Sequence, residues 1–436
     1  MRIIIALLAF VSILNSAWAG ERGGYLVRLR EDLRGQSLKH LAAQMEDSGL
    51  RVAHEYELVP GLLHIQGPGD IHAFADSFLY IEPNRLRTMT LQGPAAPVWT
   101  NSQDPEVPEK SSNLQFQIDP KFFGNYGLLQ NGIEKIWKDL NYFGDPKTII
   151  AVIDTGVDYT HRDLKNNMWR NPGESGVDSR GRDKSTNGMD DDGNGYIDDL
   201  VGYDFANNDA LPYDDHYHGT HVAGIAAAEV GNGLDTAGHC GRCSIMALKF
   251  IKSDGFGTDA DAIRAIEYAT KMGAQIINSS WGSPSYSKAL EESFAASTRA
   301  GAFHAVAAGN DGEDLTTFAF YPAKFRYPGM VTVSALYETN IYIPVWSNYG
   351  RLWSHAASAG AEVQSTVPGN GLKRLSGTSM ASPGLAGSLA LVRSKRPDLT
   401  NQQLVELLQK NIQGDKDSVG KTIFGGRPKT AAMMKP

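Results

Sequence analysis

The chain has 436 residues, of which 42% are hydrophobic and 21% are charged, a composition typical of a globular protein with one large domain and smaller accessories. Its formal net charge of −8, with no concentrated basic segment, excludes nucleic acid as the main partner. The sequence contains no internal repeat.

The first residues predict an export signal. A short positive start and an apolar run lead to Ala17-Trp18-Ala19, which has the A-x-A form of a signal-peptidase site. The run is too short for a comfortable membrane span, and no cysteine directly follows it to carry a lipid anchor. We expect residues 1–19 to be a signal peptide and the product to be extracellular or in the cell envelope or periplasm. The alternative is an ordinary buried strand or helix.

Residues 20–90 have the pattern of a small separate domain. "GGYLVRLRED" alternates as a strand does, and "SLKHLAAQMEDSGL" has helical spacing. Two strands are expected around Pro60-Gly61, a second helix in "IHAFADSFL" and a last strand in "YIEPNRLR". This β-α-β-β-α-β order predicts an α+β sandwich. Residues 91–113, rich in Pro, Ser, Asn and acids, predict an exposed linker.

Residues 114–436 alternate between buried strands and helices. "KTIIAVID" is a continuous β-branched run, as in a central parallel strand, and "HGTHVAGIAAAE" is a helix of small residues. Further strands are expected in "SIMALKFI", "AQIINSSWG", "AFHAVAAGN" and "MVTVSAL", with amphipathic helices between them. The alternation predicts a doubly wound α/β domain, with a mostly parallel sheet, helices on both faces, and ligand groups at the carboxyl ends of the strands.

Two polar residues in this domain stand where a strand ends or a helix begins. Asp154 ends a buried strand, where a carboxylate needs a cation or hydrogen-bond donors, although it could equally be a turn-former. His218 opens "HGTHVAG", and His221 lies one helical turn further on, a pair that suggests a metal site. The zinc-protease pattern H-E-x-x-H, however, has Glu at the place of Gly219.

Ser379, in "LSGTSMASPGLAG", is placed at a helix N-terminus, where free backbone N–H groups are available. The alternative is that its hydroxyl only caps the helix. A serine becomes a nucleophile when an imidazole takes its proton, and the imidazole needs a carboxylate to fix its tautomer. Asn310 follows a strand of small residues and offers an amide to an oxyanion, although Asn after Gly is commonly a turn residue.

Four sequence blocks resemble those of the subtilisin-like serine proteases (subtilases, peptidase family S8), in the family's order. They are "VIDTGVDYTHRDL", "HGTHVAGIAAA", "AAGND" and "SGTSMASPGLAG", and the resemblance covers about residues 114–436. It implies that Asp154 orients His218, that His218 is the general base, and that Ser379 is the nucleophile. Asn310 and the backbone N–H of Ser379 would form the oxyanion hole. The implied activity is that of a secreted serine endopeptidase made as an autoprocessed zymogen.

The same resemblance assigns the walls of the substrate cleft, on which a peptide would add as a strand. The wall residues are Ser280, Trp281 and Gly282 on one side, and Ala307, Ala308 and Gly309 on the other. Phe320 matches a position that is often small at the base of the family's S1 pocket, so a large ring there would restrict the pocket. Gly384 stands where the family commonly has His, and we expect an effect on packing only.

Residues 20–90 are similar to the family's propeptide, an inhibitor-I9-like domain that assists folding and inhibits. "YIEPNRLR" resembles its closing strand, after which the chain lies in the active site and is cut. This implies self-cleavage between Met89 and Gln92.

An acidic stretch between His161 and His218 predicts a structural calcium ion. Oxygen ligands at positions one, three, five, seven and nine of a calcium loop would come from Asp190, Asp192, Asn194, the carbonyl of Tyr196, and Asp198, with Gly195 at the turn. Position twelve is Val201 in place of the usual Glu, so Asp199 is a substitute ligand, and Asp163 matches a calcium position of the family. The alternative is a solvated acidic loop.

The two cysteines, Cys240 and Cys243, favour a local disulfide in an exported chain. A zinc site would need two further ligands, of which His239 is the only obvious neighbour, and a thioredoxin-like motif fits less well.

Two rival functions remain at this stage. One is a catalytically dead relative that binds peptides or calcium. The other is an esterase, since "GTSMA" imitates part of the elbow G-x-S-x-G, but Ala381 replaces its last Gly and the chain order differs. The expected partners of the peptidase are protein or peptide substrates and its own propeptide, with a monomeric chain and no membrane span after signal removal.

Overall fold

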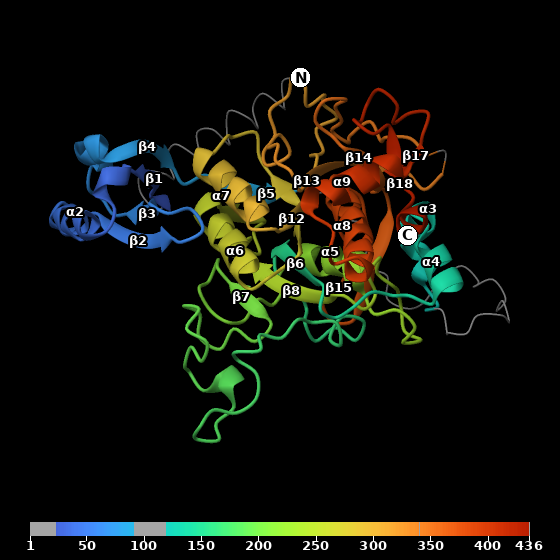
Figure 1. The fold of residues 1–436 in the computed structure, drawn as a ribbon, viewed down its shortest axis with the longest axis horizontal. Coiled ribbons are helices and arrows are strands. Elements are labelled where there is room, and N and C mark those ends of the chain that lie inside the picture. The colour runs from blue at the N-terminus through green and yellow to red at the C-terminus, as the bar shows by residue number, and fades with distance from the viewer. Residues whose placement is uncertain (1–22, 91–118, 340, 436) are drawn as a thin grey trace.

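The computed structural model describes residues 23–90 and 119–435, apart from residue 340. The expected signal peptide and linker lie outside these residues. Residues 23–90 form an N-terminal unit, drawn in blue at one side of Figure 1, and residues 119–435 form the main domain. In the described part of the chain, no helix combines the length and the apolar character that crossing a membrane requires.

The N-terminal unit is an antiparallel four-stranded sheet in the order β2-β3-β1-β4 with helix α2 packed on it. Its apolar side chains, among them Val27, Leu63 and Ile65, form a hydrophobic cluster of their own. In chain order the unit contains β1 (Tyr25–Leu29), η2 (Glu31–Leu33), α2 (Gln36–Asp47), β2 (Arg51–Tyr56), β3 (Leu62–Gln66), η3 (Ile71–Ser77), β4 (Phe78–Pro83) and β5 (Leu86–Met89).

The unit differs from the expected pattern in two places. The predicted second α-helix is the 3-10 helix η3, which starts after Asp70, whose carboxylate accepts the N–H of His72. Only Ile71 of η3 is buried, so this segment has no apolar stripe to hold a longer helix on the sheet. The predicted last strand is two strands, because the chain leaves the sheet after β4 and continues as β5 on the main domain.

The main domain is built on a seven-stranded sheet in the order β14-β13-β12-β10-β6-β8-β7, and every pairing in it is parallel. This confirms the predicted doubly wound α/β fold. The strands of this sheet are β6 (Ile149–Asp154), β7 (Gly202–Asp204), β8 (Ser244–Lys249), β10 (Ile276–Ser279), β12 (Phe303–Ala307), β13 (Met330–Leu336) and β14 (Ala356–Ala359). The α-helices are α3 (Gly127–Gln130), α4 (Ile133–Leu140), α5 (His218–Ala227), α6 (Asp259–Lys271), α7 (Lys288–Arg299), α8 (Thr378–Lys395), α9 (Asn401–Lys410) and α10 (Thr430–Met433).

Both faces of the sheet are covered, which explains why its strands are continuously apolar. Successive side chains of a strand point to opposite faces. In β6, Ile150 and Val152 therefore join the cluster that contains α5 and α8, and Ala151 and Ile153 join the cluster that contains α6 and α7. Two faces buried against helices require an apolar side chain at nearly every strand position.

Smaller elements complete the main domain. They are the 3-10 helices η4 (Phe122–Gly124) and η5 (Lys184–Thr186), the paired strands β15 (Val363–Val367) with β16 (Gly371–Leu375) and β17 (Ile412–Gly414) with β18 (Gly426–Pro428), and the short strands β9 (Phe256–Thr258) and β11 (Trp281–Gly282).

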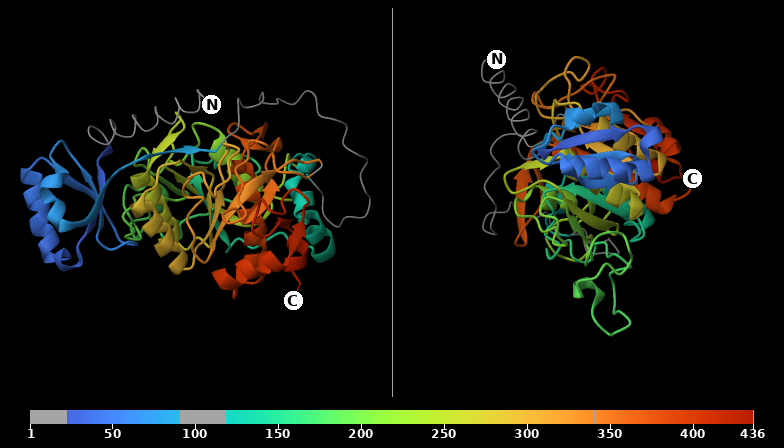
Figure 2. Two further views of the ribbon diagram at one scale, coloured as in Figure 1. Left: turned by 90° about the horizontal axis from the view of Figure 1, so that it is seen from above. Right: turned by 90° about the vertical axis from the view of Figure 1, so that its left-hand side faces the viewer.

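Strand β5 of the N-terminal unit lies between β11 and β9 of the main domain and is antiparallel to both. Figure 2 shows this chain segment leaving the N-terminal unit and running across the main domain. The N-terminal unit therefore supplies the middle strand of a sheet whose two outer strands belong to the main domain.

Candidate active site

Asp154 and His218 are joined by a hydrogen bond at the carboxyl end of the central sheet. Asp154 is the last residue of β6, His218 is the first of α5, and both side chains are fully buried. The distance from His218 Nδ1 to Asp154 Oδ1 is 2.7 Å, and the backbone N–H of Thr155 donates to the same oxygen at 2.7 Å. Because a carboxylate only accepts hydrogen bonds, Nδ1 carries the proton and the lone pair of the imidazole is on Nε2. Among the described residues, Nε2 has no hydrogen-bond partner.

The close approach of α5 to the end of β6 depends on a glycine. A Cβ on Gly219 would lie 2.0 Å from the carbonyl oxygen of Gly156, so a larger residue would push the first turn of the helix away. His218 would move with that turn and lose its contact with Asp154.

Ser379 is the second residue of α8 and is fully buried under the N-terminal unit. Its Oγ lies 2.6 Å from the carbonyl oxygen of Thr90 and 3.0 Å from that of Ser280, and 2.5 Å from Thr90 Oγ1. The hydroxyl is thus turned toward the end of β5, and no hydrogen bond joins it to His218 in the residues that the structure describes. Ser280 follows β10, the neighbour of β6, so Ser379 and Asp154 lie at the same edge of the sheet.

Asn310 lies just beyond β12 and presents an unused donor. Its Oδ1 accepts the backbone N–H and the hydroxyl of Thr378, each at 2.9 Å. These two bonds fix which end of the amide faces α8, and Nδ2 is left without a partner among the described residues although it is buried. An unpaired buried N–H carries a free-energy cost, which is recovered when a negative oxygen comes within reach.

Of the two predicted walls of the cleft, only the one formed by residues 280–282 is hydrogen-bonded to β5. Trp281 and Gly282 pair with Met89 and Thr88, and the carbonyl of Ser280 accepts the N–H of Thr90 at 3.1 Å. The Trp281 side chain is buried and donates to the carbonyl of Ile153, so only its backbone faces β5.

Residues 307–309 do not pair with β5. The strand that pairs with β5 on the side opposite β11 is β9, which the sequence analysis did not predict. Arg87 pairs with Gly257 and Thr88 with Phe256. The signal for β9 was weak, since it has three residues between a glycine turn and the start of α6.

Phe320 lies between the two predicted walls. A Cβ on Gly282 would be 2.4 Å from its ring, and a Cβ on Gly309 would be 3.1 Å from it. The ring is buried and fills the space between these two glycines. The resemblance to the family implies a side-chain pocket at this place, and a large ring here would shorten it.

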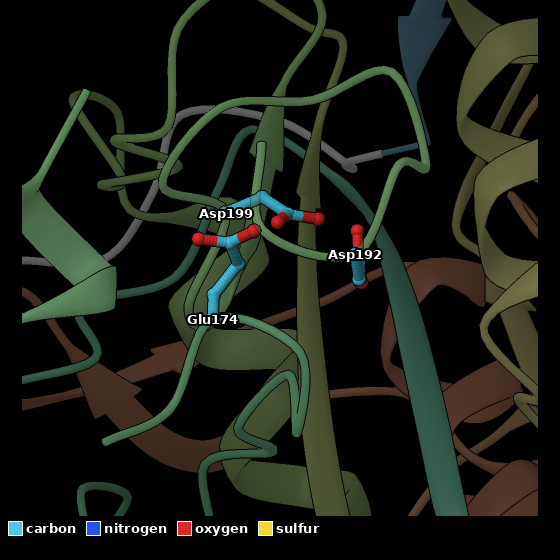
Figure 3. Close-up of side chains that lie close together, drawn as sticks. All are labelled: Glu174, Asp192 and Asp199. Carbon is cyan, nitrogen blue, oxygen red and sulfur yellow. The ribbon is translucent and has the colours of Figure 1, made fainter. Parts of the chain in front are cut away.

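Three carboxylates of the acidic insert gather at one point, as Figure 3 shows. Glu174, Asp192 and Asp199 each offer an oxygen within 4.8 Å of the others. Burial raises the pKa of Glu174 to about 7 and that of Asp199 to about 6, and the neighbouring carboxylates act in the same direction. Glu174 Oε2 has no hydrogen-bond partner among the described residues. A buried, unpaired carboxylate oxygen beside two other carboxylates fits a hard cation.

The predicted calcium ligands are only partly brought together. Asp192 belongs to the cluster and so does the substitute ligand Asp199, whereas Asp190 accepts backbone N–H groups of its own loop and Asp198 accepts the N–H of Gly188. For Tyr196 the predicted ligand is the carbonyl oxygen, which stays a prediction; its ring packs against neighbouring aromatic rings. Asn194 Nδ2 donates to both cluster aspartates. Asp163 is buried elsewhere and accepts the side-chain amide of Asn232 and the N–H of Thr236. The missed residue, Glu174, is far from the others in sequence and gave no spacing signal.

The two cysteines are bonded to each other in the structure. His239 is not beside them as a metal ligand: its Nδ1 lies 3.0 Å from the carbonyl of Ile225, and its Nε2 accepts from Asn131 at 3.3 Å. Burial lowers the pKa of His239 to about 4, so the ring is neutral. A Cβ on Gly384 would lie 3.3 Å from this ring, so position 384 has little room for a second imidazole.

The N-terminal unit also contacts the main domain away from the cleft, at the starts of α6 and α7. The Glu82 carboxylate accepts the hydroxyl of Ser287 at 2.7 Å and the backbone N–H groups of Lys288 and Ala289 at 3.0 Å each. These are free N–H groups at the positive end of α7. Asn84 accepts the N–H of Ala260 at the start of α6 in the same way.

The model of the subtilase family matches residues 145–425. Subtilisin-like protease 1 of Plasmodium vivax is 33% identical over 313 residues, which cover 67% of this chain and 48% of that protein. The thermophilic serine proteinase of Bacillus sp. (strain AK1) is 36% identical over 61% of this chain and 57% of its own length, and subtilisin E of Bacillus subtilis is 34% identical over 60% and 59%. The chain thus spans about half to three-fifths of the length of these relatives.

Among solved structures, the chain is similar to fervidolysin from Fervidobacterium pennivorans, a keratinolytic enzyme related to subtilisin. The TM-score is 0.71 at 22% sequence identity, over 95% of this chain and 61% of that one. This likeness concerns the fold. The family match over most of the main domain shows that the chain belongs to the subtilase family.

Proposed function

We propose that the protein is a serine endopeptidase in which Asp154, His218, Ser379 and Asn310 are the catalytic residues. The observation that carries the proposal is the pair of unused groups at the cleft. His218 Nε2 is an acceptor without a donor, Asn310 Nδ2 is a donor without an acceptor, and a peptide carbonyl lies 2.6 Å from Ser379 Oγ.

The chemistry follows from these groups. Ser379 Oγ turns from the Thr90 carbonyl toward Nε2, gives its proton to the imidazole and forms a bond to the carbonyl carbon of a substrate. The carbonyl oxygen becomes an oxyanion, which Asn310 Nδ2 stabilises. His218 then passes its proton to the leaving amine as the peptide bond breaks, and water releases the acyl group by the same steps in reverse. Asp154 holds the imidazole in the required tautomer through Nδ1.

The N-terminal unit is proposed to be an inhibitory propeptide that the enzyme cuts from itself. Supporting this, β5 fills the cleft as a paired strand and ends with the Thr90 carbonyl at Ser379, so the bond between Thr90 and Leu91 is the expected cleavage site. That bond falls within the expected interval between Met89 and Gln92. The signal-like residues 1–19 support export of the precursor.

A structural calcium ion is proposed at Glu174, Asp192 and Asp199. The donor set consists of hard oxygens, and the free Oε2 of Glu174 supports it. Bound calcium would tie Glu174 to the later part of the insert, which is drawn in green in Figure 1.

Covalent labelling by a fluorophosphonate tests the activity, because the reagent reacts only with a serine that an assembled site has activated. We expect the wild-type protein to be labelled and to remove its own N-terminal unit. The Ser379→Ala protein should remain unlabelled and full-length when expressed alone. Efficient processing of Ser379→Ala would refute self-cleavage. Absence of labelling in the processed wild-type protein would instead favour the rival function, a relative that binds peptides without cutting them.

A further inference from the structure

Arg87 of β5 is buried in a pocket of the main domain and makes four hydrogen bonds there. Its Nε and Nη2 donate to the two carboxylate oxygens of Asp259 at 2.5 and 3.0 Å, a bidentate ion pair. Its Nη1 donates to Ser283 Oγ and to the carbonyl of Ser285, both at 2.7 Å. Neither the Arg87 nor the Asp259 side chain has any exposed surface. The pocket therefore offers hydrogen-bond acceptors to a planar cation from three separate groups.

Within the described residues, Arg87 is the only hydrogen-bond partner of the Asp259 carboxylate. Asp259 is the first residue of α6 and belongs to the main domain, whereas Arg87 belongs to the N-terminal unit. Burial raises the pKa of Asp259 and Arg87 opposes this rise, as expected when one cation compensates one desolvated carboxylate. When β5 leaves the cleft, this carboxylate loses its partner and the pocket becomes available to another chain.

The strand register fixes which residue of another chain would enter the pocket. Thr90 pairs through its N–H with Ser280 and places its carbonyl at Ser379, and Arg87, three residues earlier, pairs with Gly257 of β9. A substrate bound in the same register between β9 and β11 presents to Asp259 its fourth residue on the amino side of the scissile bond. The residues directly before and after this fourth residue point to the opposite side of the strand, because alternate residues of a strand face opposite sides.

We propose that Asp259, with Ser283 Oγ and the Ser285 carbonyl, makes the mature enzyme select peptides with arginine at the fourth position before the cleaved bond. The proposal rests on the proposed function, since it assumes a peptidase that binds substrates as β5 is bound. Arginine is preferred to lysine because only a guanidinium can donate to both carboxylate oxygens and to the serine pair at once. A neutral side chain leaves the carboxylate desolvated and unpaired.

The test compares four internally quenched peptides with the sequence of residues 86–92, Leu-Arg-Thr-Met-Thr-Leu-Gln, cleaved by the processed wild-type enzyme. The arginine is kept or replaced by citrulline, lysine or leucine. Citrulline keeps the shape of arginine and removes its charge, and we expect it to lower kcat/KM by roughly 30-fold or more, the factor that corresponds to about 2 kcal/mol for a buried pair that loses one charge. The lysine and leucine peptides should also be cleaved more slowly. Values for all four peptides within about threefold of one another would overturn the proposal.

A pair of variants assigns the preference to one carboxylate. Asp259→Asn should bring the ratio of kcat/KM between the arginine and citrulline peptides close to one. Asp261→Asn, on the same helix, removes a carboxylate that bonds to Thr258 and not to Arg87, so it should keep the wild-type ratio. A ratio unchanged in Asp259→Asn would refute the role of Asp259.

Fluorophosphonate labelling of the wild-type enzyme separates the two levels of failure. An enzyme that is labelled and cleaves all four peptides equally refutes the arginine preference and leaves the peptidase intact. An enzyme that is neither labelled nor active on any peptide refutes the proposed function, and the arginine preference with it.

Discussion

Glu82 is the residue at which the proposed inhibitory role of the N-terminal unit can be tested without touching the cleft. Its carboxylate accepts three hydrogen bonds at the start of α7, two of them from backbone N–H groups, and it is buried in the interface. Glu82→Gln removes the negative charge from the positive end of a helix and turns an NH₂ group toward donors.

The expected loss of binding free energy between the N-terminal unit and the main domain has two contributions. A charge at a helix N-terminus in a partly buried site contributes up to about 2 kcal/mol. Hydrogen bonds to a charged group have a net contribution of roughly 1.5–3 kcal/mol to the binding free energy. Only part of this contribution is lost, because Gln retains one acceptor oxygen. We expect a net loss of about 2–4 kcal/mol, which is a roughly 30- to 1,000-fold rise in the Kd between the N-terminal unit and the main domain.

The assay titrates residues 20–90, which have their own sheet and core, onto the main domain carrying Ser379→Ala, so that no cleavage interferes. Isothermal titration calorimetry gives the Kd. Glu46→Gln is the matched control, because Glu46 is exposed and belongs to α2, the helix that Figure 1 shows on the side of the N-terminal unit away from the main domain. A Kd for Glu82→Gln within threefold of that for Glu46→Gln would show that the helix contact does not hold the unit in place.

Three further predictions concern other parts of the molecule. Phe320→Gly should allow large aromatic residues directly before the cleaved bond, measured as kcat/KM over a peptide series in which only that residue varies; an unchanged preference would mean that the ring does not limit the pocket. Removal of calcium with EGTA should lower the melting temperature, and Glu174→Gln should abolish most of the difference; equal melting temperatures with EGTA and with calcium would argue against the ion. Burial, together with the charges of Arg264, His64 and Lys271 and against the opposing charge of Glu57, lowers the pKa of His54 to about 4. A histidine with a lowered pKa is neutral in the bound state and protonates more readily when free, so binding of the N-terminal unit should weaken as the pH falls from about 6.5 to about 4, and a His54→Gln protein that keeps the wild-type pH dependence would refute this.

The fold of the main domain was predictable because its strands are buried on both faces. A run such as residues 148–153 has no polar side to orient, so its composition alone indicates a central parallel strand. The positions of Asp154 and His218 follow from the same pattern, because a strand end and a helix start are the places where a buried polar side chain can reach other polar groups. Their mutual distance was not predictable from these patterns, since it depends on the approach of α5 that Gly219 permits.

Features that depend on tertiary contact left no trace in the sequence. Glu174 lies in a stretch without periodicity, and only the folding of the insert brings its carboxylate to Asp192 and Asp199. The cleft strand β9 is too short to give an alternating pattern. The orientation of the Ser379 hydroxyl is set by Thr90, a residue of a different folding unit.

The N-terminal unit contacts the main domain at several places, among them the start of α7, held by Glu82, and the cleft, where β5 lies. The proposed cut after Thr90 removes neither of these contacts, and each contact keeps the other at a high effective concentration. If the proposed propeptide role is correct, a single cut should therefore yield a cleaved complex that is still inhibited. Release of the free protease should therefore show a lag. The length of the lag should depend on a second cut, within the N-terminal unit, that separates these contacts from one another.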